Sequence, residues 1–406
     1  MREKYEFDFT TVLARRGMDA VAYDSVGSGL WGIAPAAPKE GFDVIPMWVA
    51  DMNFPTCPAI VRAITERAQH PAFGYFLPRD AYFAAIAAWR KPGHPDIPRE
   101  AIGYENGVHG FVTSAVQALT EPGEAILLHS PYYVGFRADI EGLGRRSVFS
   151  ELRLDEDGVW RMDYEDMDRK IRENGIRVVL FCAPHNPTGR VWTREELERA
   201  AAVFEKNDVT VISDEIWADL VFPGKTHIPL QSVNPWMRAH TAAAYAPSKT
   251  FNLAGLIGSY HVIYDKALRD RIVSWGKKTH YNEMNVLSMH ALLGAYSEEG
   301  RRWTEELREV LERNAALVCR FFREEVPGVF CSMPEGTYML FADCAGYMAR
   351  TGRTLDDLLQ AGWAVGVAWQ DGRKFRGETH IRLNLASPES RIREALKRMK
   401  AYVFTE

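Results

Sequence analysis

The sequence has few cysteines, and their arrangement is typical of neither a disulfide framework nor a zinc site. There are five, an odd number, and they are scattered along the chain without a Cys-x-x-Cys pair. Small secreted domains instead pair their cysteines densely. We therefore expect free thiols and a reducing, cytoplasmic location. The cysteines are Cys57, Cys182, Cys319, Cys331 and Cys344.

The sequence also lacks long apolar runs and a strong excess of one charge. No apolar stretch has the length needed to cross a bilayer, and the opening MREKYEFDFT is too charged for a secretory signal. The formal net charge of −5 offers no attractive field for nucleic acid or anionic lipid. No basic or zinc-finger signature changes that expectation. We expect a small-molecule substrate, and neither a membrane nor nucleic acid as a partner.

What the chain does contain is enough apolar material for a large core. Of its 406 residues, 47% are hydrophobic, which allows two or three domains. From about residue 100, apolar strand candidates alternate with helical patterns, one of which opens with a capping box of Thr193 and Glu196. This alternation predicts an α/β fold with a mostly parallel sheet between helices. The strand candidates are EAILLH, VVLFC, VTVIS, TAAAY and HVIYD.

The pattern changes after about residue 285. Apolar residues from Trp303 to Phe322 recur at spacings of three, four and seven, which predicts a long amphipathic helix. Shorter strand candidates follow (YMLFAD, AVGVAW and HIRLNLA), and Ser387-Pro388 opens a last helix. This part is expected to form a smaller α+β domain.

Three segments that follow apolar strand candidates carry chemically useful side chains. Lys249 lies in APSKTF after TAAAY, Asn186 lies in PHNPTG after VVLFC, and Asp214 ends VTVISD. In open α/β sheets, working residues collect beyond the carboxyl ends of parallel strands. Each segment alone also has a structural interpretation, as a solvated lysine, a turn or a strand-end hydrogen-bond acceptor. Together they predict an active site in which Lys249 can form an imine with an aldehyde cofactor.

A rival interpretation concerns VISDEI, which is similar to the magnesium-binding strand of phosphate-loop ATPases. Those enzymes carry G-x-x-x-x-G-K-[ST] before that strand. Here the run Gly224-Lys225-Thr226 follows it, and Asp219 occupies the position of the first required glycine. Spacing and order therefore exclude the ATPase interpretation.

Over nearly its whole length the chain resembles the class I/II aminotransferase superfamily, the pyridoxal 5′-phosphate (PLP) enzymes of fold type I. Within it, PMWVADMNFPTCPAI and APSKTFNLAGL are similar to the branch of cystathionine β-lyases and C–S lyases. The resemblance implies a large PLP-binding domain over residues 53–285, with a mostly parallel mixed sheet. It implies a small domain built from residues 1–52 and 286–406. Other matching blocks are FGYFLPR, SPYYVGF, APHNPTGRVW, VISDEIWADL, EGTYML and IRLNLASP.

The resemblance implies a role for each residue around the cofactor ring. Lys249 is expected to bind PLP as an imine and, once freed, to act as a base, which burial favours by lowering a lysine's pKa. Asp214 is expected to face the pyridine nitrogen and keep the ring protonated. Asn186, with a cis bond to Pro187, is expected to hydrogen-bond the phenolic oxygen. Tyr133 is expected to stack on the ring.

The phosphate of PLP is expected at the start of the helix GFVTSAVQAL, because backbone N–H groups there bind anions. The backbone is expected to matter more than the imidazole of His109, and Ser248 adds a hydroxyl. Tyr75 matches a tyrosine that reaches the phosphate of a partner subunit, which implies a homodimer. The residues assigned to this helix start are Gly107, Val108 and His109.

Arg382, in the apolar run IRLNLA, matches the arginine that clamps the substrate α-carboxylate. A planar guanidinium binds a carboxylate through two hydrogen bonds and so orients the Cα–H bond. Asn186 and Tyr133 are expected to contact the substrate as well. Loops at residues 22–38 and 275–285 are expected to form part of the side-chain pocket.

Three positions depart from the broad aminotransferase pattern. Ile257 stands where many members have a phosphate-binding arginine, and Ala246 stands where a serine is common. The missing arginine is shared with the C–S lyase branch, which favours that branch. Trp217 replaces a tyrosine or histidine near the phenolic oxygen; it is expected to narrow the pocket, and its indole N–H remains a hydrogen-bond donor.

These observations predict a PLP-dependent β-eliminating C–S lyase, which cleaves an L-cysteine conjugate to a thiol, pyruvate and ammonia. The alternative is an aminotransferase that uses the same residues, because both reactions begin with removal of the Cα proton. A ligand-sensing transcriptional regulator with the same fold is disfavoured, since the segment before MWVADM is under fifty residues and has no basic recognition helix.

Overall fold

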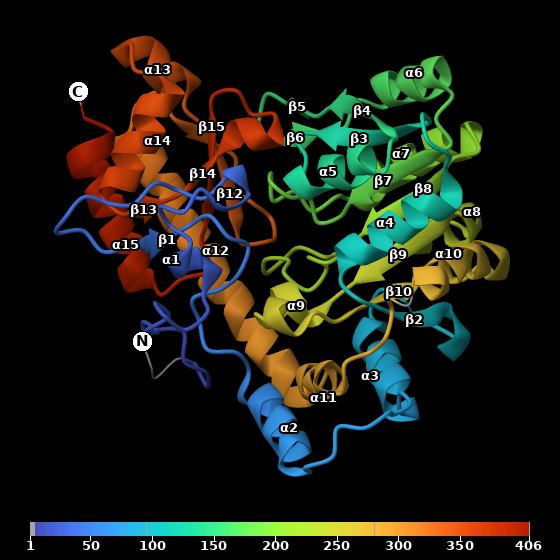
Figure 1. Cartoon of the computed structure of the whole chain (residues 1–406). Coiled ribbons are helices and arrows are strands. Elements are labelled where there is room, and N and C mark those ends of the chain that lie inside the picture. The colour runs from blue at the N-terminus through green and yellow to red at the C-terminus, as the bar shows by residue number, and fades with distance from the viewer. Residues whose placement is uncertain (1–4, 95, 280, 406) are drawn as a thin grey trace.

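The computed structural model describes residues 5–94, 96–279 and 281–405. Figure 1 shows two halves side by side, a larger one built on a long sheet and a smaller one that holds both chain ends. No helix among the described residues is long and apolar enough to cross a membrane.

The larger half contains a seven-stranded sheet in the order β2-β10-β9-β8-β7-β3-β4. The five strands from β9 to β4 are parallel, while β10 runs antiparallel to both of its neighbours. The sheet is therefore mixed but mostly parallel, and the predicted α/β fold class is confirmed. The strands are β2 (Ile102–Glu105), β3 (Ala125–Ser130), β4 (Arg146–Glu151), β7 (Val178–Cys182), β8 (Thr210–Asp214), β9 (Thr241–Tyr245) and β10 (Ser259–Val262).

Four of the five predicted strands of this sheet form as expected, because apolar side chains cover both of its faces, whereas HVIYD overlaps β10 only at His261 and Val262. Leu127 and Val179 belong to the core on one face, and Ile126 and Leu180 belong to the core on the other. Strand β4 (RSVFSE) was not predicted, since as an edge strand it carries polar and exposed side chains. Helices α6 (Tyr164–Asn174), α7 (Arg194–Lys206) and α8 (Pro235–His240) pack on the first face, and α4 (Val108–Leu119), α5 (Val134–Gly142) and α10 (Lys266–Thr279) on the second.

The predicted capping box is present at the start of α7. Thr193 accepts a hydrogen bond from the backbone N–H of Glu196, and the Glu196 carboxylate accepts one from the backbone N–H of Thr193. This exchange satisfies N–H groups that have no partner within the helix.

The smaller half is built on an antiparallel sheet in the order β11-β12-β15-β14. The predicted strands YMLFAD and HIRLNLA form β12 and β15, whereas AVGVAW contributes only two residues, which pair in parallel with β1 near the N-terminus. The strands are β1 (Ile45–Pro46), β11 (Phe330–Cys331), β12 (Met339–Asp343), β13 (Val367–Ala368), β14 (Gln370–Asp371) and β15 (His380–Asn384); a separate hairpin joins β5 (Arg153–Leu154) and β6 (Trp160–Arg161).

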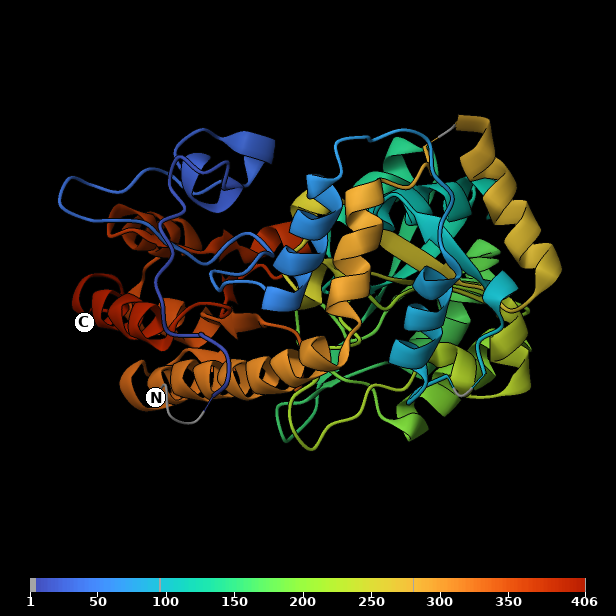
Figure 2. The ribbon, with the colours of Figure 1, turned by 90° about the horizontal axis from the view of Figure 1, so that it is seen from below.

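The long helix predicted after residue 285 is α12 (Glu298–Glu325), and its predicted apolar residues are buried. It connects the two halves: Trp303 stacks on Phe251 in the larger half, and Phe322 packs edge-on against Phe404 near the C-terminus. Figure 2 shows it running from the small half towards α11. The other helices are α1 (Val21–Asp24), α2 (Pro58–Gln69), α3 (Asp80–Arg90), α9 (Pro247–Thr250), α11 (Val286–Ala295), α13 (Ala345–Thr351), α14 (Leu355–Ala364) and α15 (Glu389–Arg398).

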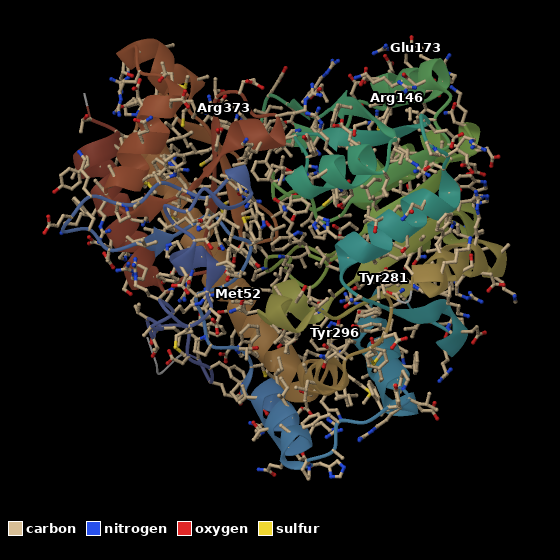
Figure 3. All side chains as sticks on the ribbon, viewed as in Figure 1. Met52, Arg146, Glu173, Tyr281, Tyr296 and Arg373 are labelled. Carbon is tan, nitrogen blue, oxygen red and sulfur yellow. The ribbon has the colours of Figure 1, made fainter. Side chains whose placement is uncertain are left out.

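Because α12 spans both halves, the predicted domain boundaries at residues 53 and 285 stay a prediction. Met52, beside the first boundary, lies where the two halves meet (Figure 3). The active-site residues predicted from the sequence come from both sides of this junction.

Candidate active site

A cavity of about 310 Å³ opens beyond the carboxyl ends of β7, β8 and β9. Its walls come from the loops and helices that follow these adjacent parallel strands, as expected for an open α/β sheet. Most of the predicted site residues line it. They are Gly107, Val108, His109, Tyr133, Asn186, Asp214, Trp217, Ser248 and Lys249.

Lys249 is on the short helix α9, which follows β9 and begins with Pro247. Its ammonium or amine nitrogen Nζ donates a hydrogen bond to the backbone carbonyl of Ala50, at 2.8 Å. Burial lowers the pKa of Lys249 to about 8, although the carboxylates of Asp51 and Asp214 oppose this change. A substantial fraction of the amine is therefore neutral near pH 8, as a nucleophile or base requires.

Asp214 ends β8, and its carboxylate accepts a hydrogen bond from the backbone N–H of Ile216 at 3.0 Å. Burial raises the pKa of Asp214 to about 6, while the positive charges of His109 and Lys249 act in the opposite direction. A cation placed in the cavity would stabilise the charged form of this carboxylate.

Arg382, on β15, reaches the junction from the smaller half. Its guanidinium donates to the side-chain oxygen of Asn186 at 3.3 Å and to the carbonyl of Trp48 at 2.8 Å. The Nε of Arg382 is buried without a hydrogen-bond partner, and no ion pair with a carboxylate is found for it within the described residues. Burial lowers the pKa of Arg382 to about 10. A carboxylate of a bound ligand would supply the ion pair and the hydrogen bond that this buried guanidinium lacks.

The peptide bond between Asn186 and Pro187 is cis, as predicted from the resemblance. Asn186 is buried and lines the cavity, so its amide is available to a ligand on one side and to Arg382 on the other. The Asn186 side chain therefore lies between the cavity and the guanidinium of Arg382.

Tyr133 caps the start of α5 and is held by His109. The Nε2 of His109 lies 3.2 Å from the Tyr133 hydroxyl, and its Nδ1 lies 2.6 Å from Asp139. The hydrogen bond to Asp139 raises the pKa of His109, and burial raises the pKa of Tyr133 to about 12. The imidazole of His109, which the sequence left without a function, thus positions the Tyr133 ring.

The start of α4 supplies backbone donors at the other side of the cavity. Gly107 caps this twelve-residue helix with φ +85°, a conformation that side chains with a Cβ rarely adopt. The first N–H groups of a helix lack partners within the helix, so they can bind an anion. Ser248 lines the same cavity from α9.

Sequence reasoning missed a contact between Ala50, which lines the cavity, and Tyr338. The hydroxyl of Tyr338 donates to the carbonyl of Ala50 at 2.9 Å, which is the atom that also binds Lys249. The Tyr338 ring packs edge-on against Trp217 at 4.7 Å between centroids. Ala50 and Tyr338 lie in the segments PMWVADMNFPTCPAI and EGTYML, on which the resemblance rests. Because Ala50 acts through its backbone carbonyl, its residue type does not reveal this role.

Two predicted site residues, Tyr75 and Arg382, do not line the cavity. Tyr75 is fully exposed, in a segment at residues 71–79 without regular secondary structure, and it does not line the cavity. Ile257 and Ala246 line the cavity but offer no side-chain donor. An anion bound there therefore receives no hydrogen bond from the side chains at these two positions.

Comparison with known proteins gives one consistent result. The sequence pattern of the family "Aminotransferase class I and II" matches residues 43–399. Cystathionine beta-lyase PatB of Bacillus subtilis (strain 168) is 32% identical over 95% of this chain and 97% of its own length. Protein MalY of Escherichia coli (strain K12) is 30% identical over 96% of this chain and 97% of its own length.

Solved structures agree with these sequence matches. A PLP-bound putative aminotransferase from Clostridium difficile 630 is 31% identical, with a TM-score of 0.89 over 97% of this chain and 99% of its own. Cystalysin from Treponema denticola, which contains pyridoxal 5′-phosphate, is 28% identical, with a TM-score of 0.88 over 97% and 98% of the two chains. A PLP-bound C–S lyase from Staphylococcus hominis is 27% identical, with a TM-score of 0.88 over 99% of both.

Proposed function

Because this chain belongs to the aminotransferase class I and II family, as a PLP-dependent carbon–sulfur lyase, we propose that it cleaves L-cysteine S-conjugates such as cystathionine. With water, each substrate molecule gives a thiol, pyruvate and ammonia. The single observation that carries the proposal is the buried lysine, with a pKa lowered to about 8, in the same cavity as the buried Asp214. An amine beside a carboxylate of this kind suits proton removal from Cα.

The residues of the cavity fit PLP. Lys249 supplies the amine for a covalent bond to the aldehyde, and the buried carboxylate of Asp214 suits a protonated pyridine nitrogen. The N-terminus of α4 suits the phosphate, with Gly107 leaving the backbone accessible. Tyr133 is assigned to the ring face and Asn186 to the phenolic oxygen. When bound, PLP withdraws electrons from Cα of the attached amino acid.

The chain's own residues can then orient and deprotonate the substrate. Arg382 is assigned to the α-carboxylate, which would reach its unpartnered Nε and replace the weak 3.3 Å contact to Asn186. Lys249 is assigned as the base for the Cα proton. The sulfur substituent then leaves from Cβ as a thiolate, and it takes up a proton on release.

We infer that the working enzyme is a homodimer. The segment at residues 71–79 exposes Phe73, Tyr75 and Leu77 together, which is unusual for a surface that faces only water. Tyr75 of the partner subunit is assigned to the phosphate, for which Ile257 and Ala246 provide no donor. Each cavity would then be completed by the other copy.

The proposal is tested by incubating the purified protein with cystathionine and no keto acid. Pyruvate and free thiol are expected in equal amounts, and Lys249→Ala should form neither. The C. difficile neighbour is described as a putative aminotransferase. An enzyme of that kind would instead form glutamate when 2-oxoglutarate accompanies an amino donor. That outcome, without pyruvate and thiol from cystathionine alone, would contradict the lyase proposal.

A further inference from the structure

Residues 48–52, called the strap below, form an irregular segment of bends that follows β1 and reaches the junction between the halves at Met52 (Figure 3). Its backbone carbonyls accept hydrogen bonds from side chains of other elements. Asn384 donates to the carbonyls of Val49 and Asp51, both at 2.6 Å, and Arg15 donates to that of Met52 at 2.9 Å. The strap is therefore fixed in position by long-range contacts and not by secondary structure of its own.

The carbonyl of Ala50, in the middle of the strap, accepts two hydrogen bonds. One comes from Lys249 at 2.8 Å and the other from Tyr338 at 2.9 Å, which uses both lone pairs of the oxygen. Tyr338 is 1% exposed, and its ring is held against Trp217. Its hydroxyl is thus a rigid donor aimed at the atom that holds the lysine.

We propose that the Ala50 carbonyl is the docking position of the Lys249 amine whenever that amine is not bonded to the cofactor, and that Tyr338 is a positioning residue that fixes this carbonyl. The inference rests on the proposed role of Lys249. During turnover the lysine must leave the cofactor when substrate arrives and must then remove a proton in a defined direction. A neutral amine that donates one N–H to Ala50 keeps its lone pair free and fixed in orientation.

Tyr338 also affects the basicity of the docked amine. The two donors share one carbonyl oxygen, and the hydrogen bond from Tyr338 draws electron density from that oxygen, which disfavours an ammonium charge at the other donor. Removal of the hydroxyl leaves the carbonyl to Lys249 alone, which favours the protonated form. The other charged groups that face Lys249 are Asp51 on the strap, Asp214 on β8, Arg382 on β15 and His109 on α4, and a Tyr338→Phe substitution leaves all of them in place.

The test measures Lys249 directly in the cofactor-free protein. An amine-selective reagent labels Lys249 at a series of pH values, and peptide mass spectrometry gives the labelling rate. In Tyr338→Phe the midpoint of this profile should move upward by roughly half a pH unit relative to the unsubstituted protein. A midpoint that stays in place or moves downward would overturn the proposal.

The matched control is Tyr347→Phe. Tyr347 is also 1% exposed, lies in the same half, and donates its hydroxyl to a backbone carbonyl, that of Thr405, at 2.8 Å. Its loss should change stability in a similar way but leave the Lys249 midpoint unchanged. If Tyr338→Phe does not fold, Tyr338→Leu, which also lacks the hydroxyl, must show the same upward movement for the proposal to stand.

A second measurement uses the loaded enzyme. The acidic limb of the kcat profile, which reports the neutral lysine, should move upward in Tyr338→Phe, and kcat should fall with little change in KM. A fall in kcat by the same factor at every pH is expected from a purely structural defect, and it would contradict the positioning role. Because the labelling experiment needs no substrate, its result is independent of whether the lyase reaction itself has been assigned correctly.

Discussion

The carboxylates of Asp214 and Glu215 are neighbours in the chain but enter different surroundings. Asp214 lines the cavity with one backbone hydrogen bond, whereas Glu215 accepts from Tyr245 at 2.7 Å and from Ser213 at 2.9 Å, and lies 2.8 Å from His227. Burial tends to raise the pKa of both, but the hydrogen bond and charge of His227 leave that of Glu215 lowered. The Asp214 carboxylate is therefore open to a ligand in the cavity, whereas the Glu215 carboxylate is bound by side chains of the fold.

Substitution of the two acids should therefore have opposite consequences. Asp214→Asn should lower kcat/KM by about a hundredfold or more, because the buried charge that supports the cofactor is lost. Glu215→Gln should retain most activity but lower the free energy of unfolding by roughly 1–3 kcal/mol, since buried donors lose a charged acceptor. Steady-state kinetics and denaturant unfolding of both variants check the assignment. Loss of activity in Glu215→Gln without loss of stability would contradict it.

The stability of the cofactor-free protein should depend on pH through Asp214. Its pKa is raised from 3.8 to about 6, so the folded state holds a proton that the unfolded state has lost. The carboxylate thus destabilises the fold as pH rises from about 4 to 6, by roughly 3 kcal/mol at most. Asp214→Asn should be more stable than the unsubstituted protein at pH 7, and the difference should vanish near pH 4. Urea unfolding at the two pH values measures this; equal differences at both would contradict the raised pKa.

Uptake of PLP by the cofactor-free protein should accelerate with pH. The aldehyde reacts with the neutral amine, and burial lowers the pKa of Lys249 from 10.5 to about 8. The rate should rise towards pH 8 and level off above it. Stopped-flow absorbance of the bound cofactor gives the profile, with Lys249→Ala as the control that shows no borohydride-reducible absorbance. A rate still rising steeply at pH 10 would indicate an ordinary solvated lysine.

The sequence predicted the part of the site that follows the rules of α/β sheets. Lys249, Asp214 and Asn186 each follow an apolar run, and adjacent parallel strands bring the ends of such runs together. Their meeting in one cavity was therefore foreseeable, while their chemical roles remain predictions. Trp217 was noticed only as a departure from a pattern, and its contact with Tyr338 was not foreseeable.

The contact that was missed joins residues that are far apart along the chain. Ala50 and Tyr338 are 288 positions apart, yet Tyr338 donates to the Ala50 carbonyl that also accepts from Lys249. Local periodicity contains no information on such a meeting. The same limit applies to Tyr75, whose proposed partner lies in another copy of the chain.

Arg382 should be required for substrates that carry an α-carboxylate. Arg382→Lys keeps a positive charge but loses the planar pair of donors, so kcat/KM for cystathionine should fall by about a hundredfold. The matched substrate is the corresponding cysteamine S-conjugate, which lacks the carboxylate. The slow rate at which this substrate is cleaved should be nearly equal in Arg382→Lys and in the unsubstituted protein. A similar loss with both substrates would show that Arg382 acts on the fold or the cofactor instead.

The proposed exchange of Tyr75 between subunits can be tested by complementation. Lys249→Ala and Tyr75→Ala subunits should each form dimers with little activity, because every site lacks one of the two residues. After the two proteins are unfolded together and refolded, half of the dimers should be mixed. One site of each mixed dimer then combines an intact Lys249 with an intact Tyr75 of the partner subunit, so activity should return to about a quarter of that of the unsubstituted enzyme. If both residues of a site came from the same chain, mixing would restore nothing, since every site would still lack one of them.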